Sequence, residues 1–344
     1  MKTLRLTALA LLLSFQVFAQ ESSDESQMDF TPQIHGSIRG KYEYQPEIDE
    51  SRFQVRNARL NVSGFALENV YYKAEIDLSD QGVIRMLDAY VRLYAMKDLS
   101  FSIGQMRVPF TIDAHRSPYA RYFANRSFIG KQVGDIRDVG AVVAYTHERG
   151  AVPYILEGGV YNGDGLLEQK EWQSNLNSSL KAQMWFGNNW NLTLSHQRLQ
   201  PAEVIVNMYD AGANFSTDRM HIEFEYLYKT YSQNAFDDVY SINAFAMYNF
   251  PLKRGFFKNI SILGRYDMMT DHSDGEMDDD EIAAGKLNID DAARDRLTGG
   301  ITFSLDKMFV ADIRLNYEKY FYHSSAAINQ SELDKIVIEF VCKF

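Results

Sequence analysis

Cysteine is almost missing from this sequence: Cys342 is the only one among 344 residues. A single thiol excludes an internal disulfide and any metal site built from several cysteines. Beyond the first twenty residues the chain also lacks an apolar run of the length, about 20 residues, that a membrane helix needs. Membrane-spanning helices are therefore excluded for that part of the chain.

Basic residues are outnumbered, and catalytic motifs are lacking. The chain has 35 Lys and Arg against 46 Asp and Glu, a formal net charge of −11, which makes nucleic acid a poor partner. It has no Gly-x-Ser-x-Gly elbow, no Walker loop and no zinc-binding helix motif. His147, His196 and His221 fall in expected strands without a serine or acid at a recognisable spacing. The sequence therefore predicts no enzyme, no cofactor and no bound metal.

The N-terminus reads as a signal peptide. Lys2 and Arg5 precede a short apolar run at 6–18, and small residues stand at positions 17 and 19, which is typical of a cleavage site. We expect residues 1–19 to be removed and 20–32 to form an acidic, flexible leader. A retained N-terminal anchor is the alternative, and no cysteine follows the cut for a lipoprotein anchor.

Apolar and polar residues alternate over long stretches, for example in 71–78, 220–229 and 311–318. A period of two is that of a β-strand with one apolar and one polar face. Aromatic residues make up 13% of the chain, and its mean hydropathy is −0.31. Both values fit a membrane barrel, which has aromatic girdles and a polar lumen.

Counting such stretches gives about sixteen strands. They are 33–44, 52–64, 70–78, 84–94, 99–107, 138–148, 152–162, 178–187, 190–199, 203–215, 218–230, 238–250, 256–269, 296–305, 309–320 and 334–344. Short polar turns alternate with longer connections at 108–137, 163–177, 231–237, 270–295 and 321–333. This alternation predicts an all-β fold at 33–344: a transmembrane antiparallel β-barrel in the outer membrane of a Gram-negative bacterium, with both termini periplasmic. A soluble β-sandwich would not need this alternation of short turns and long connections.

The last strand continues its alternation to the final residue. Ile336, Ile338, Phe340, Cys342 and Phe344 share one face. A terminal Phe that ends an amphipathic strand resembles the signal read by the outer-membrane barrel assembly machinery. Cys342 is then expected to be a small apolar residue that faces lipid.

Several segments carry a family resemblance. They are RNARLNVSG at 56–64, LDAYV at 87–91, IGQMRVPF at 103–110, RSF at 126–128 and DIRDVG at 135–140. Together they resemble the phosphate-selective porin O/P family, most closely over residues 50–165. The resemblance implies a 16-stranded barrel that is usually a trimer, with one loop folded into the lumen and an anion path lined by arginine and lysine.

The candidate inward loop is 108–137, which holds five basic residues against Asp113 and Asp135. The basic residues are Arg116, Arg121, Arg126, Lys131 and Arg137. A constriction lined by such groups raises the local anion concentration, and arginine holds phosphate through paired donors. The alternative is that these residues balance loop carboxylates or contact lipopolysaccharide phosphates.

Alternation also places Arg59, Lys73 and Arg92 on the lumen side of their strands. They extend the candidate anion path, unless they pair with Glu75 and Asp88 across neighbouring strands. The same rule puts Arg107 on the lipid face unless Pro109 re-aims it. It leaves Arg56 ambiguous, because Arg56 shares parity with Ala58.

The chain departs from the family pattern in two places. It has Arg56-Asn57 where the family tends to show two basic residues, and it is acidic overall, which argues against phosphate selectivity but not against a porin. Acidic residues are most concentrated in residues 271–295, and we expect a solvated extracellular loop there. Its carboxylates are Asp274, Glu276, Asp278, Asp279, Asp280, Glu281, Asp290 and Asp291. Binding of divalent cations, bridging to lipopolysaccharide included, is the alternative.

The sequence thus predicts an outer-membrane porin for passive diffusion of small hydrophilic solutes, with a preference for anions or phosphate as its sharper form. An outer-membrane barrel hydrolase and a plugged structural or adhesive barrel are the alternatives.

Overall fold

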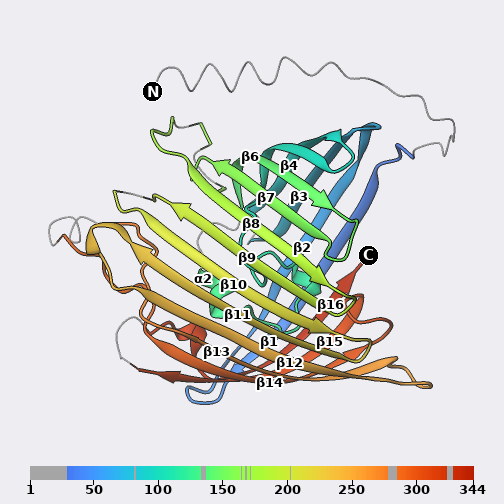
Figure 1. Cartoon of the computed structure of the whole chain (residues 1–344). Coiled ribbons are helices and arrows are strands. Elements are labelled where there is room, and N and C mark those ends of the chain that lie inside the picture. Colours follow the sequence, from blue (N-terminus) through green and yellow to red (C-terminus); the bar gives the residue numbers. More distant parts are fainter. Residues whose placement is uncertain are drawn as a thin grey trace.

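The structure, a computed structural model, describes residues 29–80, 83–132, 137–163, 165–166, 169–170, 172–201, 203–277, 285–323 and 328–344. Within these residues sixteen strands form one closed antiparallel barrel (Figure 1). Each strand pairs with its neighbours in sequence, and β1 closes the barrel on β16. The expected signal peptide at 1–19 and most of the 20–32 leader lie outside the described residues.

The strands confirm the barrel that the alternation predicted, and their bounds differ from the expected ones by at most three residues. They are β1 (Gln33–Gln45), β2 (Glu50–Leu67), β3 (Val70–Asp80), β4 (Val83–Met96), β5 (Leu99–Arg107), β6 (Arg137–His147), β7 (Tyr154–Tyr161), β8 (Asn177–Phe186), β9 (Trp190–Leu199), β10 (Val206–Ser216), β11 (Met220–Tyr231), β12 (Val239–Pro251), β13 (Asn259–Met269), β14 (Arg294–Ser304), β15 (Ala311–Tyr322) and β16 (Lys335–Lys343).

In the residues that the structure describes, helical structure lies only in the connections between strands. The pieces are η1 (Pro118–Ala120), α2 (Phe128–Gln132), η2 (Ser232–Asn234) and η3 (Gln330–Glu332). No helix in the described part of the chain has the length and apolar character needed to cross a membrane.

The barrel is polar inside and apolar outside, which the strand period dictates. On β11, Glu223 and Glu225 are fully buried, whereas Ile222 and Phe224 are more than two-fifths exposed. Charged side chains such as Arg314 are therefore among the largest fully buried groups. The inner wall is a layer of charges, and the outer wall is the surface that lipid covers.

The C-terminal residue completes the closure. Phe344 and Gly36 exchange backbone hydrogen bonds of 2.8 and 3.0 Å. A Cβ atom on Gly36 would stand 2.3 Å from the Phe344 ring, so any other residue at position 36 would displace this ring. Cys342 pairs with the exposed Ile38 and lies on the outward face, as its parity predicts.

A change of pleat at Gly104 turns Arg107 toward the inside. Gly104 has a φ of 129° and pairs directly with Gly140. Beyond this pair Arg107 donates to the carbonyl of His115 and, at 3.4 Å, to Ser117 Oγ. The prediction that alternation puts Arg107 on the lipid face is therefore wrong, and the reversal begins before Pro109.

Gly104→Ala is expected to destabilise the barrel by about 2 kcal/mol or more. An L-residue at this φ is strained by roughly 1–3 kcal/mol, and the new Cβ would lie 2.3 Å from the carbonyl oxygen of Ala89. Urea unfolding in detergent micelles, followed by tryptophan fluorescence, measures the loss. Gly299→Ala is the matched control, because nothing lies within 4 Å of its Cβ position. Equal midpoints for the two variants would refute this account of Gly104.

A β-bulge in β2 resolves the orientation of Arg56. Arg39 pairs with Asn57 and Gly40 with Val55, so Arg56 is the extra residue. Bulges re-aim side chains. Here Arg56 lines an interior cavity, and Val55 is exposed on the outer face.

Candidate functional site

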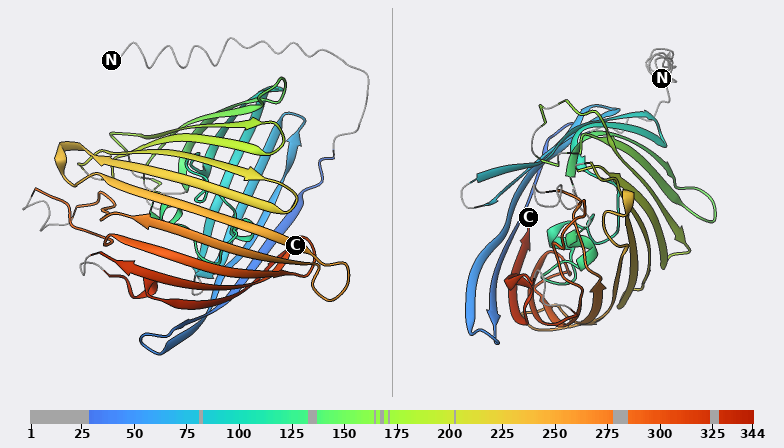
Figure 2. Two further views of the ribbon diagram at one scale, coloured as in Figure 1. Left: turned by 60° about the horizontal axis from the view of Figure 1, so that its bottom comes forward. Right: turned by 90° about the vertical axis from the view of Figure 1, so that its left-hand side faces the viewer.

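The connection after β5 turns into the barrel (Figure 2, right, where α2 lies within the ring of strands). Residues 108–132 of this connection are described, and we call them the inner loop. Residues 133–136, Asp135 among them, lie outside the described residues. The contacts of the inner loop with inward-facing side chains fix its place in the lumen.

One set of contacts joins the inner loop to β8, β9 and β11. The amide of Thr111 donates to Ser195 Oγ at 3.0 Å, and its carbonyl accepts from Lys181 Nζ at 2.7 Å. The amide of Ile112 donates to Glu225 at 2.5 Å. Arg116 forms an ion pair with the fully buried Glu223. The first half of the inner loop is thus held against this wall.

A second set joins the inner loop to β13, β14, β15 and β1. The amide of Ala124 donates to Asn316 Oδ1 at 2.8 Å, and its carbonyl accepts from Arg39 at 2.7 Å. The amide of Phe128 donates to Asp267 at 3.0 Å, and Arg296 donates to the carbonyl of Arg126 at 2.6 Å. The inner loop therefore crosses the lumen and rests on the far side of the barrel.

Asp113 holds the two halves of the inner loop together. Its carboxylate accepts from the Ser127 amide at 3.0 Å and from Ser127 Oγ at 2.9 Å, and Arg116 lies 3.5 Å away. Burial opposes ionisation of Asp113. The positive charges of Arg116, Arg126 and Arg121 outweigh burial and lower the pKa of Asp113 to about 2.

Three candidate residues form ion pairs with carboxylates on other strands. Arg59 contacts Asp77 at 3.1 Å and Glu75 at 3.3 Å. Lys73 contacts Asp88 at 2.6 Å, and Arg137 contacts the same carboxylate at 2.7 Å. For Arg59 and Lys73, whose partners lie on the adjacent strand, the alternative of cross-strand pairing holds, whereas Arg137 on β6 reaches over β5 to Asp88 on β4. Their local fields are partly cancelled.

Other candidates are also engaged. Lys131 contacts Glu332 at 2.6 Å. Arg126 donates to two carbonyls of the inner loop, those of Ala114 and Gly130, each at 3.0 Å. Arg92 donates to Ser102 Oγ at 2.9 Å and lies 5.4 Å from the Tyr90 ring centroid. Glu332 lies 201 residues from Lys131, so spacing could not reveal this pair.

Arg121 differs from all of these. Its residue exposure is 6%, and its Nε is buried without a hydrogen-bond partner. Among the described residues, no carboxylate lies within ion-pair distance of its guanidinium. Burial and the nearby Arg126 and Arg39 lower the pKa of Arg121 well below its usual value. Arg121 thus lies inside the barrel with no ion-pair partner among the described residues, and the carboxylate of Asp113 acts on it only from a longer distance.

Two interior cavities flank the middle of the inner loop along the β1–β2 wall. The cavity on the extracellular side has about 310 Å³ and is lined by Arg56, Arg121 and Arg126. The cavity on the periplasmic side has about 390 Å³ and is lined by Arg59, Lys73 and Tyr119. Arg56, ambiguous in the sequence, thus joins Arg121 at one cavity.

Both cavities are lined by an excess of positive charge. The basic residues of the first are Lys41, Arg52, Arg56, Arg121, Arg126, Lys131, Arg296 and Lys335, and its acidic residues are Glu43 and Glu332. The second has Arg59, Lys73 and Lys343 against Glu75. A chain with a net charge of −11 therefore has a basic interior along this wall.

The acidic connection between β13 and β14 is less solvated than expected. His272, Ser273 and Ala292 are buried, and the imidazole of His272 contacts the carbonyl of Gln132 at 3.1 Å. Asp291 pairs with Arg294 at 3.4 Å. The prediction of a fully solvated loop is therefore wrong for these residues. His272 and Asp291 contact Gln132 of α2, and the carbonyl of Ser273 accepts from Lys229 and Tyr231 of β11.

The remaining acids of this connection divide into two groups. Asp274, Glu276 and Asp290 are exposed, whereas Asp278, Asp279, Asp280 and Glu281 lie outside the described residues. Among described residues, no group of three or more His, Cys, Asp or Glu is arranged to hold a metal ion.

His221 has partners that the sequence did not reveal. Ser216 Oγ lies 2.7 Å from His221 Nδ1, and Glu223 lies 3.3 Å from His221 Nε2. The imidazole stacks on Tyr122 of the inner loop, with ring centroids 4.6 Å apart. His221 and Glu223 therefore both contact the inner loop.

Solved structures with the same fold include outer-membrane proteins, a porin and a channel among them. An anion-selective porin from Comamonas acidovorans has a TM-score of 0.63 at 10% identity, covering 91% of this chain and 99% of that chain. OmpT of Vibrio cholerae, in its trimer form, has a TM-score of 0.62 at 11% identity, covering 91% and 99%. The outer-membrane channel DcaP of Acinetobacter baumannii has a TM-score of 0.60 at 13% identity, covering 91% and 97%. No curated protein sequence matches the chain.

The family model of phosphate-selective porins O and P matches residues 30–247. This match spans more than half of the chain and includes β1 to β11, the inner loop and the first cavity's Arg56, Arg121 and Arg126. The protein is an outer-membrane channel for small solutes in a Gram-negative bacterium, and it belongs to the phosphate-selective porin O and P family.

Proposed function

We propose that the protein is a homotrimeric, non-enzymatic porin that favours small anions, phosphate included, and that residues 108–137 form its constriction. The path runs past the two cavities, which lie between the inner loop and the β1–β2 wall. Arg121 carries the proposal: an unpaired guanidinium beside a water-accessible path attracts anions and repels cations.

Several further features support this path. Arg56 adds a second cation without an ion-pair partner among the described residues, aimed into the same cavity as Arg121. The paired residues Arg59, Lys73, Arg116, Arg126, Lys131 and Arg137 supply donors while their charge is shared with carboxylates or carbonyls. The trimeric state is supported by the trimer form of a structural neighbour.

The reversal potential in a planar bilayer tests the preference. Under a tenfold potassium chloride gradient the purified protein is expected to give a potential of the sign set by chloride. Added inorganic phosphate should reduce the chloride current, because phosphate binds arginine pairs more tightly. A cation-selective potential would sink the anion proposal and leave a general porin. The absence of any conductance would instead favour a plugged barrel.

One observation bears on the hydrolase alternative, namely the chain of contacts from Ser216 through His221 to Glu223. We assign these contacts a role in holding the inner loop in place, because both carboxylate oxygens of Glu223 already accept hydrogen bonds from the two terminal nitrogens of Arg116. Hydrolysis of a p-nitrophenyl ester that disappears in Ser216→Ala would contradict this assignment.

A further inference from the structure

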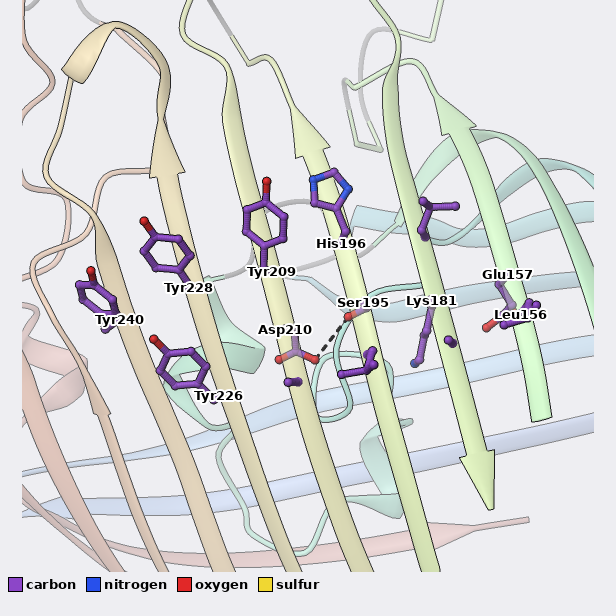
Figure 3. A pocket seen from close by; sticks show the side chains of 14 residues that line it. Leu156, Glu157, Lys181, Ser195, His196, Tyr209, Asp210, Tyr226, Tyr228 and Tyr240 are labelled. Carbon is purple, nitrogen blue, oxygen red and sulfur yellow. Dashed lines mark hydrogen bonds between the residues drawn. The ribbon is translucent and has the colours of Figure 1, made fainter. Parts of the chain in front are cut away.

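The outer face of the barrel has a groove over β7 to β12, with a volume of about 790 Å³ (Figure 3). This volume lies within the roughly 300–1,000 Å³ range of sites that hold small molecules. Outward side chains line most of it: Leu156, Leu180, Ala182, Leu194, His196, Tyr209, Ala211, Tyr226, Tyr228 and Tyr240. The groove is therefore on the lipid side of the wall.

Strand register explains the hollow. Leu194 pairs with Ala182 on one side and with Ala211 on the other, and Ala211 pairs with Tyr226. Ala211 leaves a hollow between the longer side chains of Leu194 and Tyr226, and Ala182 leaves one between Leu156 and Leu194. The floor is apolar and lies in the middle of the strands, where hydrocarbon is the surrounding medium.

Rings form the next row toward the extracellular side (Figure 3). His196, Tyr209, Tyr228 and Tyr240 pair in sequence across β9 to β12. Their successive ring centroids are 4.8, 6.2 and 5.2 Å apart. Such rows mark the membrane–water interface of barrels. The groove therefore opens beneath the outer-leaflet interface.

A cation stands directly above the rings. Arg198 is two residues beyond His196 on the same face and pairs with Asn207. Its guanidinium donates to Gln200 Oε1 at 3.2 Å, and among described residues it has no carboxylate within ion-pair distance. Ser178 and Thr230 extend this polar row on either side. An uncompensated guanidinium at headgroup level fits a phosphate.

We infer that this face binds one lipid A unit of lipopolysaccharide, with a phosphate on Arg198 and an acyl chain in the groove. The outer leaflet at this level consists of that phosphorylated glycolipid. The order from top to bottom is cation, aromatic ring and apolar hollow, and it matches the order of phosphate, sugar and acyl chain. A second copy of the chain would not require this order.

Native mass spectrometry of the detergent-purified protein, titrated with bis-phosphorylated lipid A, tests the site. Arg198→Gln is expected to weaken binding about tenfold to a hundredfold, as loss of a charge-assisted hydrogen bond does. The same variant should bind dephosphorylated lipid A as the wild type does. Ala211→Phe fills the hollow and should weaken both lipids.

Two outward variants serve as controls. Lys319→Gln removes a cation at the extracellular end of β15 that is already paired with Asp334, and Ala246→Phe adds a ring outside the groove. Neither should change lipid A affinity, and unchanged heat-modifiable mobility on gels shows that all variants fold. Wild-type affinity in Arg198→Gln would overturn the inference. So would an Ala211→Phe protein that keeps lipid A but loses its oligomer, since a second copy would then occupy the groove.

Discussion

Replacing Arg121 by glutamate is expected to turn an anion-selective channel into a cation-selective one. The change moves two charge units at a point where, among the described residues, no carboxylate lies within ion-pair distance. One unit charge at about 4 Å acts with roughly 1 kcal/mol in water and 4 kcal/mol near a protein surface. The anion-to-cation permeability ratio should therefore fall about tenfold or more.

The measurement is the reversal potential under the same chloride gradient as for the wild type. Arg254→Glu changes the net charge equally but lies in the exposed turn between β12 and β13, and its potential should remain that of the wild type. Lys131→Ala should have a smaller effect than Arg121→Ala, because Glu332 already neutralises Lys131. If Arg121→Glu kept wild-type selectivity, Arg121 would not face the path.

Loss of the charge on Asp113 is expected to free the inner loop and raise conductance. Asp113→Asn removes the negative charge and one of the two acceptor oxygens of residue 113, which weakens its hydrogen bonds with Ser127 and leaves Arg116 with one carboxylate fewer. Single-channel recordings at neutral pH should show larger, noisy currents. Asp306→Asn, an exposed acid in the turn between β14 and β15, should remain quiet.

The pKa of the Asp113 carboxylate also lets us predict how the channel current changes at low pH. The pKa of Asp113 falls from its usual value of 3.8 to about 2 in the folded protein. The ionised acid therefore stabilises the docked loop, by about 2 kcal/mol above pH 4. This contribution disappears as the pH falls from about 4 to about 2. Wild-type currents should be steady at pH 7 and pH 5 and become noisy below about pH 3. Steady currents at pH 2 would contradict this role.

The barrel was predictable because one local rule applies to every strand: apolar side chains face outward and alternate with polar side chains that face inward. The adjacent residues Glu223 and Phe224 illustrate this rule. A period of two needs no knowledge of the neighbouring strands. Sequence reading therefore found all sixteen strands and the inward direction of Arg59, Lys73 and Arg92.

The site was less predictable, because its charges are set by contacts across the lumen. Arg116 and Glu223 are 107 residues apart, and no spacing rule connects them. Alternation did not predict the inward direction of Arg107 and Arg56, because the pleat changes at Gly104 and β2 has a bulge at Arg56. Glycine in IGQMRVPF was a visible signal for the first. The bulge that re-aims Arg56 has no such signal in its sequence.

The inner loop is held mainly through its backbone. The amides of Thr111, Ile112, Ala124 and Phe128 donate to the wall, and the carbonyls of Ala124, Asn125 and Arg126 accept from it. Backbone groups are present whatever the side chain, proline apart. Side chains that face the path can therefore be exchanged while the loop keeps its course. This makes the protein a scaffold on which new solute preferences can evolve, or be engineered, without rebuilding the barrel.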